Sequence, residues 1–92
     1  MKTSDYTEFT VSGTPGAFIL VCEGKERVMN TRQGIVLAAK MRHHLRCYPE
    51  DEILFFRRED LTGEDSEEEI AVKRDSVLKA RYFLKNDIGL SD

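Results

Sequence analysis

Alternation of apolar and polar residues predicts two strands at the start of the chain. Residues 6–11 alternate with the two-residue period of a half-buried strand, so Phe9 and Val11 are expected to face the core. The segment 12–16 combines two glycines with a proline, which is the composition of a tight turn. Residues 17–23 are a short, almost continuous apolar run, and this pattern favours a strand that is buried on both faces.

Apolar residues next recur at the spacing of an α-helix, between residues 30 and 48. The side chain of Asn30 can accept from the first free backbone amides, and Gln33 can reach back to it, so these two residues predict a capping box. Pro49 ends the predicted helix, because proline cannot continue the hydrogen-bonding pattern. The buried stripe of this helix is expected to comprise Ile35, Ala38, Met41, Leu45 and Tyr48.

Composition predicts two further strands. Residues 27–29 allow a short third strand after a turn at Gly24, and residues 52–58 place four apolar residues between acids and arginines. The polar, glycine-containing segment 59–65 is expected to be a loop.

The segment 66–88 has two interpretations. It contains neither Gly nor Pro, and its acids precede its bases as a helix dipole prefers, so one long helix is favoured. Its buried stripe would comprise Ile70, Val77, Ala80, Leu84 and Ile88. Lys73 and Arg74 interrupt that stripe, however. The alternative is a short strand at 69–73 followed by a helix that begins after Asp75.

Together these elements predict a single α+β domain. The expected order is β-β-(β)-α-β-α, which gives a small, mainly antiparallel sheet of three or four strands with two helices packed on one face. A length of 92 residues fits one compact domain over residues 1–92, with 1–5 and 89–92 frayed. Apolar residues make up 40% and charged residues 34% of the chain, so general disorder is excluded.

The expected location of the protein and the redox state of its cysteines depend on targeting segments and on the number of cysteines. Residues 1–15 lack the basic start and apolar run of a signal peptide, and no apolar run approaches the roughly 20 residues of a membrane span. We therefore expect a cytoplasmic protein without membrane contact. Cys22 and Cys47 are too few for a disulfide framework, so both are expected to be free thiols that pack rather than react.

The distribution of charged residues is the most informative feature of the sequence, because residues of like charge are grouped into separate segments. The charged residues from 31 to 49 are all basic, acids dominate 50–69, and bases return after residue 72, so a net charge of −3 hides two cationic segments. If the two helices lie side by side, their cations form one partner-binding surface: Arg32, Lys40, Arg42, Arg46, Lys79, Arg81 and Lys85. A secondary acidic contact is expected from Glu64, Asp65, Glu67, Glu68 and Glu69.

No set of residues indicates catalysis. His43, His44 and Cys47 resemble a metal site, but a helical pair supplies only two of the four ligands that zinc prefers. Cys47 also lies at the helix end whose dipole disfavours a thiolate. The 12–16 turn lacks the Lys-Ser or Lys-Thr pair of a phosphate-binding loop. We therefore expect no enzyme activity, no metal and no cofactor.

The leading hypothesis is a non-enzymatic binding protein that docks through charged surfaces on a larger protein or ribonucleoprotein assembly. One alternative is a small nucleic-acid-binding regulator that contacts backbone phosphates, and another is a DNA mimic that acts through the acidic segment. No family motif is recognised. The profile of one compact domain with segregated charge resembles that of small accessory proteins of phages and mobile elements, including anti-CRISPR proteins. This resemblance implies inhibition by occupying a partner's surface, while the oligomeric state stays open.

Overall fold

The computed structural model describes residues 6–89, which form five strands and three helices. The first half contains β1 (Phe9–Thr14), β2 (Ala17–Cys22), β3 (Lys25–Met29) and α1 (Thr31–Cys47). The second half contains β4 (Ile53–Arg57), α2 (Arg58–Thr62), β5 (Glu69–Lys73) and α3 (Arg74–Ile88). This confirms the α+β class and the antiparallel pairing that the sequence predicts.

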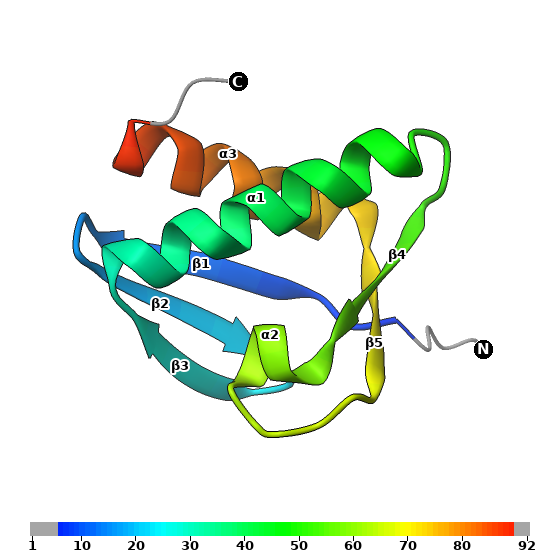
Figure 1. Ribbon diagram of the computed structural model, residues 1–92, viewed down its shortest axis with the longest axis horizontal. Helices are drawn as coiled ribbons and strands as arrows, with labels where there is room; N and C mark the ends of the chain where they lie inside the picture. The colour runs from blue at the N-terminus through cyan, green and yellow to red at the C-terminus, as the bar shows by residue number, and fades with distance from the viewer. Residues whose placement is uncertain (1–5, 90–92) are drawn as a thin grey trace.

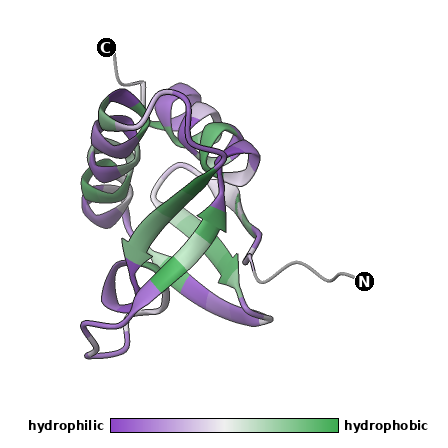
Figure 2. Cartoon of the chain, turned by 90° about the vertical axis from the view of Figure 1, so that its right-hand side faces the viewer, coloured by the Kyte–Doolittle hydropathy of each residue, from purple (hydrophilic) through white to green (hydrophobic). Residues whose placement is uncertain are grey.

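Helices α1 and α3 lie side by side over one face of the three-stranded sheet β1-β2-β3 (Figure 1). Helix α3 packs mainly on β1, whereas α1 contacts β2 and β3. The ribbon of β4 and β5 stands at one end of the molecule, and the short helix α2 lies beside β2 and β3. Figure 2 shows hydrophobic residues gathered on the strands and hydrophilic residues on the connecting loops.

The three-stranded sheet is covered on one face only. Phe9 and Val11 of β1 are buried, as predicted. In β2 only Phe18, Leu20 and Cys22 are buried, whereas Ile19 and Val21 on the opposite face remain half-buried, so the prediction of a strand buried on both faces was wrong. The apolar run supplies side chains to both faces, but both long helices pack on the same one.

Helix α1 begins and ends where the sequence predicts. The backbone N–H of Gln33 donates to Asn30 Oδ1 at 2.9 Å, and the backbone N–H of Asn30 donates to Gln33 Oε1 at 3.0 Å, which completes the capping box. At the other end, the Tyr48 N–H donates to the His44 carbonyl at 3.0 Å, just before Pro49.

The buried stripe of α1 is rotated relative to the prediction. Its buried residues are Gly34, Leu37, Ala38 and Met41, while the predicted Ile35 and Tyr48 are exposed and Leu45 is half-buried. Gly34 is in close contact with its surroundings, since a Cβ there would lie 3.1 Å from Ile88 Cδ1 and 3.2 Å from the ring of Phe18. The helix thus approaches both α3 and the sheet through the one residue that has no side chain.

The segment 66–88 contains a strand and a helix, so the favoured interpretation of one long helix was wrong. Residues 69–73 form β5, as in the alternative interpretation, and α3 begins at Arg74. Ile70 and Val72 of β5 are buried and pair across from β4. Strand pairing and burial therefore outweigh the local preference of an acid-rich segment for helix.

The strands form two sheets, where a single sheet was expected. Thr7 joins them, because its N–H donates to the Ala71 carbonyl at 2.8 Å and its carbonyl accepts from the Lys73 N–H at 3.2 Å. The predicted loop 59–65 also contains most of α2, a helix of five residues that is too short to show a helical period in the sequence. Gly63 ends α2 in the left-handed conformation.

One core fills the space between helices and sheets. Phe9 and Phe56 meet edge to face with ring centroids 6.4 Å apart, and Phe18 meets Phe83 in the same way at 6.5 Å. These pairs connect the three-stranded sheet to β4 and to α3. Fraying was expected for residues 1–5 and 89–92. Gly89 instead caps α3 in the left-handed conformation and its N–H donates to the Lys85 carbonyl at 2.9 Å, whereas residues 1–5 and 90–92 lie outside the described residues.

Two adjacent phenylalanines of β4 provide a matched test of this core. Phe56 is 1% exposed and also stacks on His44, whereas Phe55 is 53% exposed. We expect Phe56→Ala to reduce the free energy of unfolding by about 3–5 kcal/mol. Phe55→Ala should cost about 1 kcal/mol or less in the monomer. Urea unfolding followed by circular dichroism at low protein concentration measures both values, and equal losses would contradict this assignment of the core.

Candidate functional site

Helices α1 and α3 bring three of the seven predicted cations together. Arg42 and Arg46, one turn apart on α1, and Arg81 from the middle of α3 line a hollow of about 320 Å³, with Leu45 as its apolar wall. Arg81 is only 9% exposed, so its guanidinium is largely withdrawn from bulk water. We call Arg42, Arg46 and Arg81 the α1–α3 cationic surface.

The other four predicted cations lie elsewhere. Arg32 and Lys40 line a separate hollow between α1, β3 and α2. Lys79 forms an ion pair with Asp75 at 3.1 Å, as the four-residue spacing predicts, and does not line the hollow of Arg81. Lys85 is half-buried in the last turn of α3 and is also outside the lining of that hollow. The cations of the two helices therefore meet at one place, without forming a continuous stripe.

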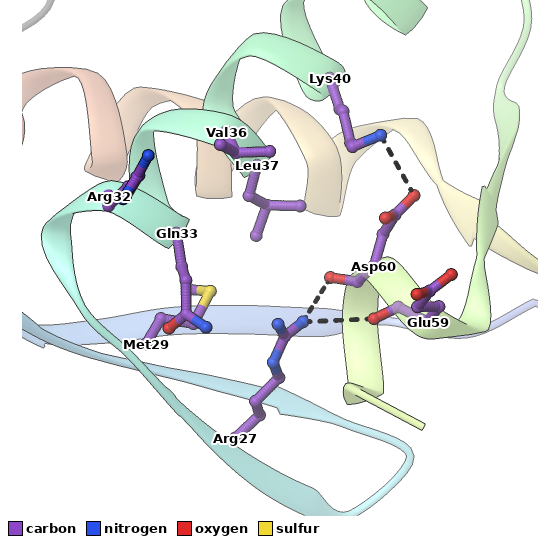
Figure 3. Close-up of a pocket in the computed structure, with 9 residues that line it drawn as sticks. All are labelled: Arg27, Met29, Arg32, Gln33, Val36, Leu37, Lys40, Glu59 and Asp60. Carbon is purple, nitrogen blue, oxygen red and sulfur yellow. Dashed lines mark hydrogen bonds and ion pairs between the residues drawn. The ribbon is translucent and has the colours of Figure 1, made fainter. Parts of the chain in front are cut away.

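The hollow beside α2 is organised by an arginine that the sequence analysis did not select. Arg27 of β3 donates from Nη1 to the carbonyl oxygens of Asp60 at 2.7 Å and Glu59 at 3.5 Å (Figure 3). Lys40 approaches the Asp60 carboxylate at 3.7 Å from the other side. The Arg27 guanidinium thus supplies hydrogen-bond donors to backbone carbonyls in the last turn of α2, which is the role of a helix cap. An isolated arginine in a strand gives no sequence signal for this contact.

Arg32 differs from its neighbours in this hollow. It is exposed, and within residues 6–89 its side chain forms no hydrogen bond or ion pair. The hollow, of about 360 Å³, therefore contains two cations that hold α2 in place and one that contacts solvent. This favours a structural role for most of its polar groups.

Part of the acidic segment is already paired within the molecule. Glu64 contacts Lys25 at 3.2 Å, and Glu68 contacts Arg58 at 3.3 Å. Arg58 also binds Glu23 at 2.8 Å, and this hydrogen bond raises the pKa of the guanidinium against the effect of desolvation. The remaining members, Asp65, Glu67 and Glu69, are exposed and form no ion pair with the described part of the chain.

The histidines and cysteines divide into separate roles. His43 and Cys47 share one face of α1, as predicted, with Nε2 and Sγ 3.5 Å apart. His44 instead stacks on Phe56 with centroids 4.3 Å apart and donates from Nδ1 to the Lys40 carbonyl at 2.7 Å, so it anchors α1 to β4. Over residues 6–89, no group of three or more His, Cys, Asp or Glu side chains has the geometry of a metal site.

Both cysteines are free thiols, but only one is packed. Cys22 is buried in β2, and burial together with nearby Glu23 raises its pKa to about 11, against the opposing effect of Arg58. Cys47 is exposed, so the expectation that both thiols pack was wrong for this residue. Its position at the exposed helix end explains the difference.

Comparisons of this chain with protein-family models, curated proteins and solved structures find no match. None of the helices between residues 6 and 89 combines the length and apolar composition needed to cross a bilayer.

Substitution of the two arginines in Figure 3 separates structural from surface roles. Arg27→Ala should lower the free energy of unfolding by about 1–3 kcal/mol, because it removes charge-assisted bonds to partly buried carbonyls. Arg32→Ala should change it by no more than about 0.5 kcal/mol, because no such contact is lost. Thermal or urea unfolding checks the pair, and a similar effect of both variants would refute the capping role of Arg27.

The two thiols should differ in reactivity. In the folded protein at a pH of about 8, Cys47 should react with a thiol reagent within minutes, whereas Cys22 should react only as the protein opens. Mass spectrometry of the modified peptides identifies the labelled residue. Rapid labelling of Cys22 without denaturant would show that its burial is wrong.

The raised pKa of Cys22 also gives a pH dependence. The unfolded thiol loses its proton near the ordinary value of 9.0, below the folded value of about 11, so the stability that this thiol contributes declines as pH rises between them. The decline in unfolding free energy over that range should be less steep in Cys22→Ala than in the unsubstituted protein. Parallel slopes would exclude this contribution.

Proposed function

We propose that this chain is a non-enzymatic binding protein that docks through its α1–α3 cationic surface on an anionic patch of a larger protein or ribonucleoprotein. The observation that supports the proposal is the convergence of Arg42, Arg46 and Arg81, from two different helices, on one hollow. Charged residues that are distant in sequence and adjacent in space are typical of a recognition surface.

The chemistry of arginine suits this role. Each guanidinium presents its donors in a planar fork that matches a carboxylate or phosphate group in two-point contact. Arg81 is held by the helix pair with little exposure, so an anion that reaches it interacts in surroundings of lower dielectric than water. Arg42 is half-buried and Arg46 is exposed, so both are more accessible than Arg81 and would steer an anionic partner during encounter.

A partner that contains protein is favoured over bare nucleic acid. A dedicated nucleic-acid binder usually carries a basic domain, whereas this chain has a net charge of −3. Lys40 and Lys79 are also paired with Asp60 and Asp75, which shortens the cationic track available to a phosphate backbone. A compact anionic patch fits the three-arginine hollow better than a long polyanion does.

The remaining functional alternatives receive less support. DNA mimicry requires an ordered array of available carboxylates, and Glu64 and Glu68 are engaged by Lys25 and Arg58. Inhibition of the anti-CRISPR type, implied by the overall profile, would be one outcome of docking on a ribonucleoprotein. A cytoplasmic location accords with the two free thiols.

The proposal is tested with a charge-reversed variant. The tagged protein is used to capture partners from host lysate with and without nuclease, and the captured partner is then purified for affinity measurement. Arg42→Glu combined with Arg46→Glu should weaken binding by at least about tenfold at moderate salt, since it reverses the sign of the docking surface. The matched control, Lys25→Glu with Lys79→Glu, makes the same change in net charge at exposed positions outside the hollow.

The outcomes separate the hypotheses. Loss of binding in the arginine variant and not in the control supports the proposed surface. Equal affinity of the arginine variant and the unsubstituted protein would remove the proposal. Equal loss in both variants would show nonspecific attraction, and binding to purified RNA or DNA with a steep salt dependence would favour the nucleic-acid regulator instead.

A further inference from the structure

Strand β4 has one edge that is not paired in the monomer. It pairs with β5 alone, and the bonds from the Arg58 N–H to Glu68 and from the Arg74 N–H to Glu52 show that the even-numbered residues face β5. The backbone groups of the odd-numbered residues therefore face the other edge. Within residues 6–89 the backbone groups of Ile53 and Phe55 form no backbone hydrogen bond, whereas the carbonyl of Arg57 belongs to the first turn of α2.

Apolar side chains are also exposed on one face of β4. Phe55 is 53% exposed, and Ile53 beside it on the same face is half-buried. An unpaired apolar edge is a template for another strand, and most proteins block such edges with charge or cover. The edge strand β3 is protected in this way, because Lys25, Glu26 and Arg27 occupy it and α2 lies beside it.

Charges at the two ends of β4 indicate which strand fits. Three acids, Glu50, Asp51 and Glu52, precede the apolar centre of β4, and two arginines, Arg57 and Arg58, follow that centre. In an antiparallel pair, the start of one strand lies opposite the end of the other. A second copy of β4 therefore places acids opposite arginine at both ends, which makes the strand complementary to itself.

We propose that two copies of this chain associate through antiparallel pairing of β4 with β4, which joins the two ribbons into a continuous four-stranded sheet. The two-fold axis passes midway between Leu54 and the partner's Leu54. Ile53 therefore lies opposite the partner's Phe55, and Arg57 lies opposite the partner's Asp51 and next to the partner's Glu52. Backbone hydrogen bonds then form between Ile53 of each copy and the partner's Phe55.

The ion pairs within the monomer do not prevent the pairing of β4 with a second copy. Arg57 contacts Glu59 at 2.6 Å, and both side chains are about half-exposed. An exposed pair of this kind contributes about 1 kcal/mol or less, so Arg57 can exchange it for the partner's acids at little cost. Asp51 and Glu52 are exposed and form no side-chain ion pair with the described residues. The self-pairing edge shares no residue with the α1–α3 cationic surface, so either proposal can fail without the other.

Two charge-reversed variants test the pairing directly. Arg57→Glu places an acid opposite the partner's acids at 51 and 52, whereas Asp51→Lys with Glu52→Lys places bases opposite the partner's Arg57. Each variant alone should therefore dissociate at least about tenfold more readily than the unsubstituted protein, a change of about 1.4 kcal/mol. A mixture of the two should recover a dimer, because each end of the mixed pair again joins opposite charges.

Analytical ultracentrifugation from about 1 µM to about 1 mM covers the range expected of a small interface. The unsubstituted protein should become dimeric within that range, and Phe55→Lys should remain a folded monomer by circular dichroism. A monomer at every concentration would overturn the proposal. So would dimers of unchanged strength in both charge variants, or a mixture of the two variants that stays monomeric.

Discussion

The fold depends on the two backbone hydrogen bonds that Thr7 makes with β5. A two-stranded ribbon such as β4–β5 is at best marginally stable by itself, so it depends on contacts with the rest of the molecule. Thr7 fixes the ribbon against the start of β1 at 2.8 and 3.2 Å, and Phe9, two residues later, then packs against Phe56 of the ribbon. This junction merges two small sheets into one core.

Many charged side chains form hydrogen bonds or ion pairs within the chain. The grouping of charge in the sequence therefore suggests more cations and anions available to a partner than the folded protein has. Arg27 holds the end of α2, Arg58 joins Glu23 and Glu68, and Lys40 and Lys79 each have an acidic neighbour. The acidic segment lies between two basic ones in the sequence and folds back on β3 and α2, where several of its carboxylates meet cations. The surface on which cations of both long helices meet is smaller than the sequence implies, but it is formed by two helices rather than by a loop.

The candidate surfaces differ in how far the sequence predicts them. The sequence supplied the cations of the two basic segments but left open whether these segments lie side by side. The structure brings Arg42, Arg46 and Arg81 to one hollow, and their role in partner binding stays a proposal. Arg32 was expected on the same surface but lies in the first turn of α1, about ten residues before Arg42, and lines the hollow beside α2 instead. The β4 edge was not anticipated, although its order of acids, apolar residues and arginines is plain in the sequence. That order acquires meaning only when one edge of the strand is known to be unpaired.

Local signals in the sequence determined the α+β class, the hairpins of the first half and the start of α1, because turns and caps depend on residues close together in the chain. The tertiary structure alone decided that residues 69–73 form a strand, that the strands divide into two sheets, and which helix faces are buried. Each of these outcomes depends on partners distant in sequence. Residues 69–73 have a charged, helix-compatible composition, and they become a strand because β4 and Thr7 satisfy their backbone groups while Ile70 and Val72 enter the core.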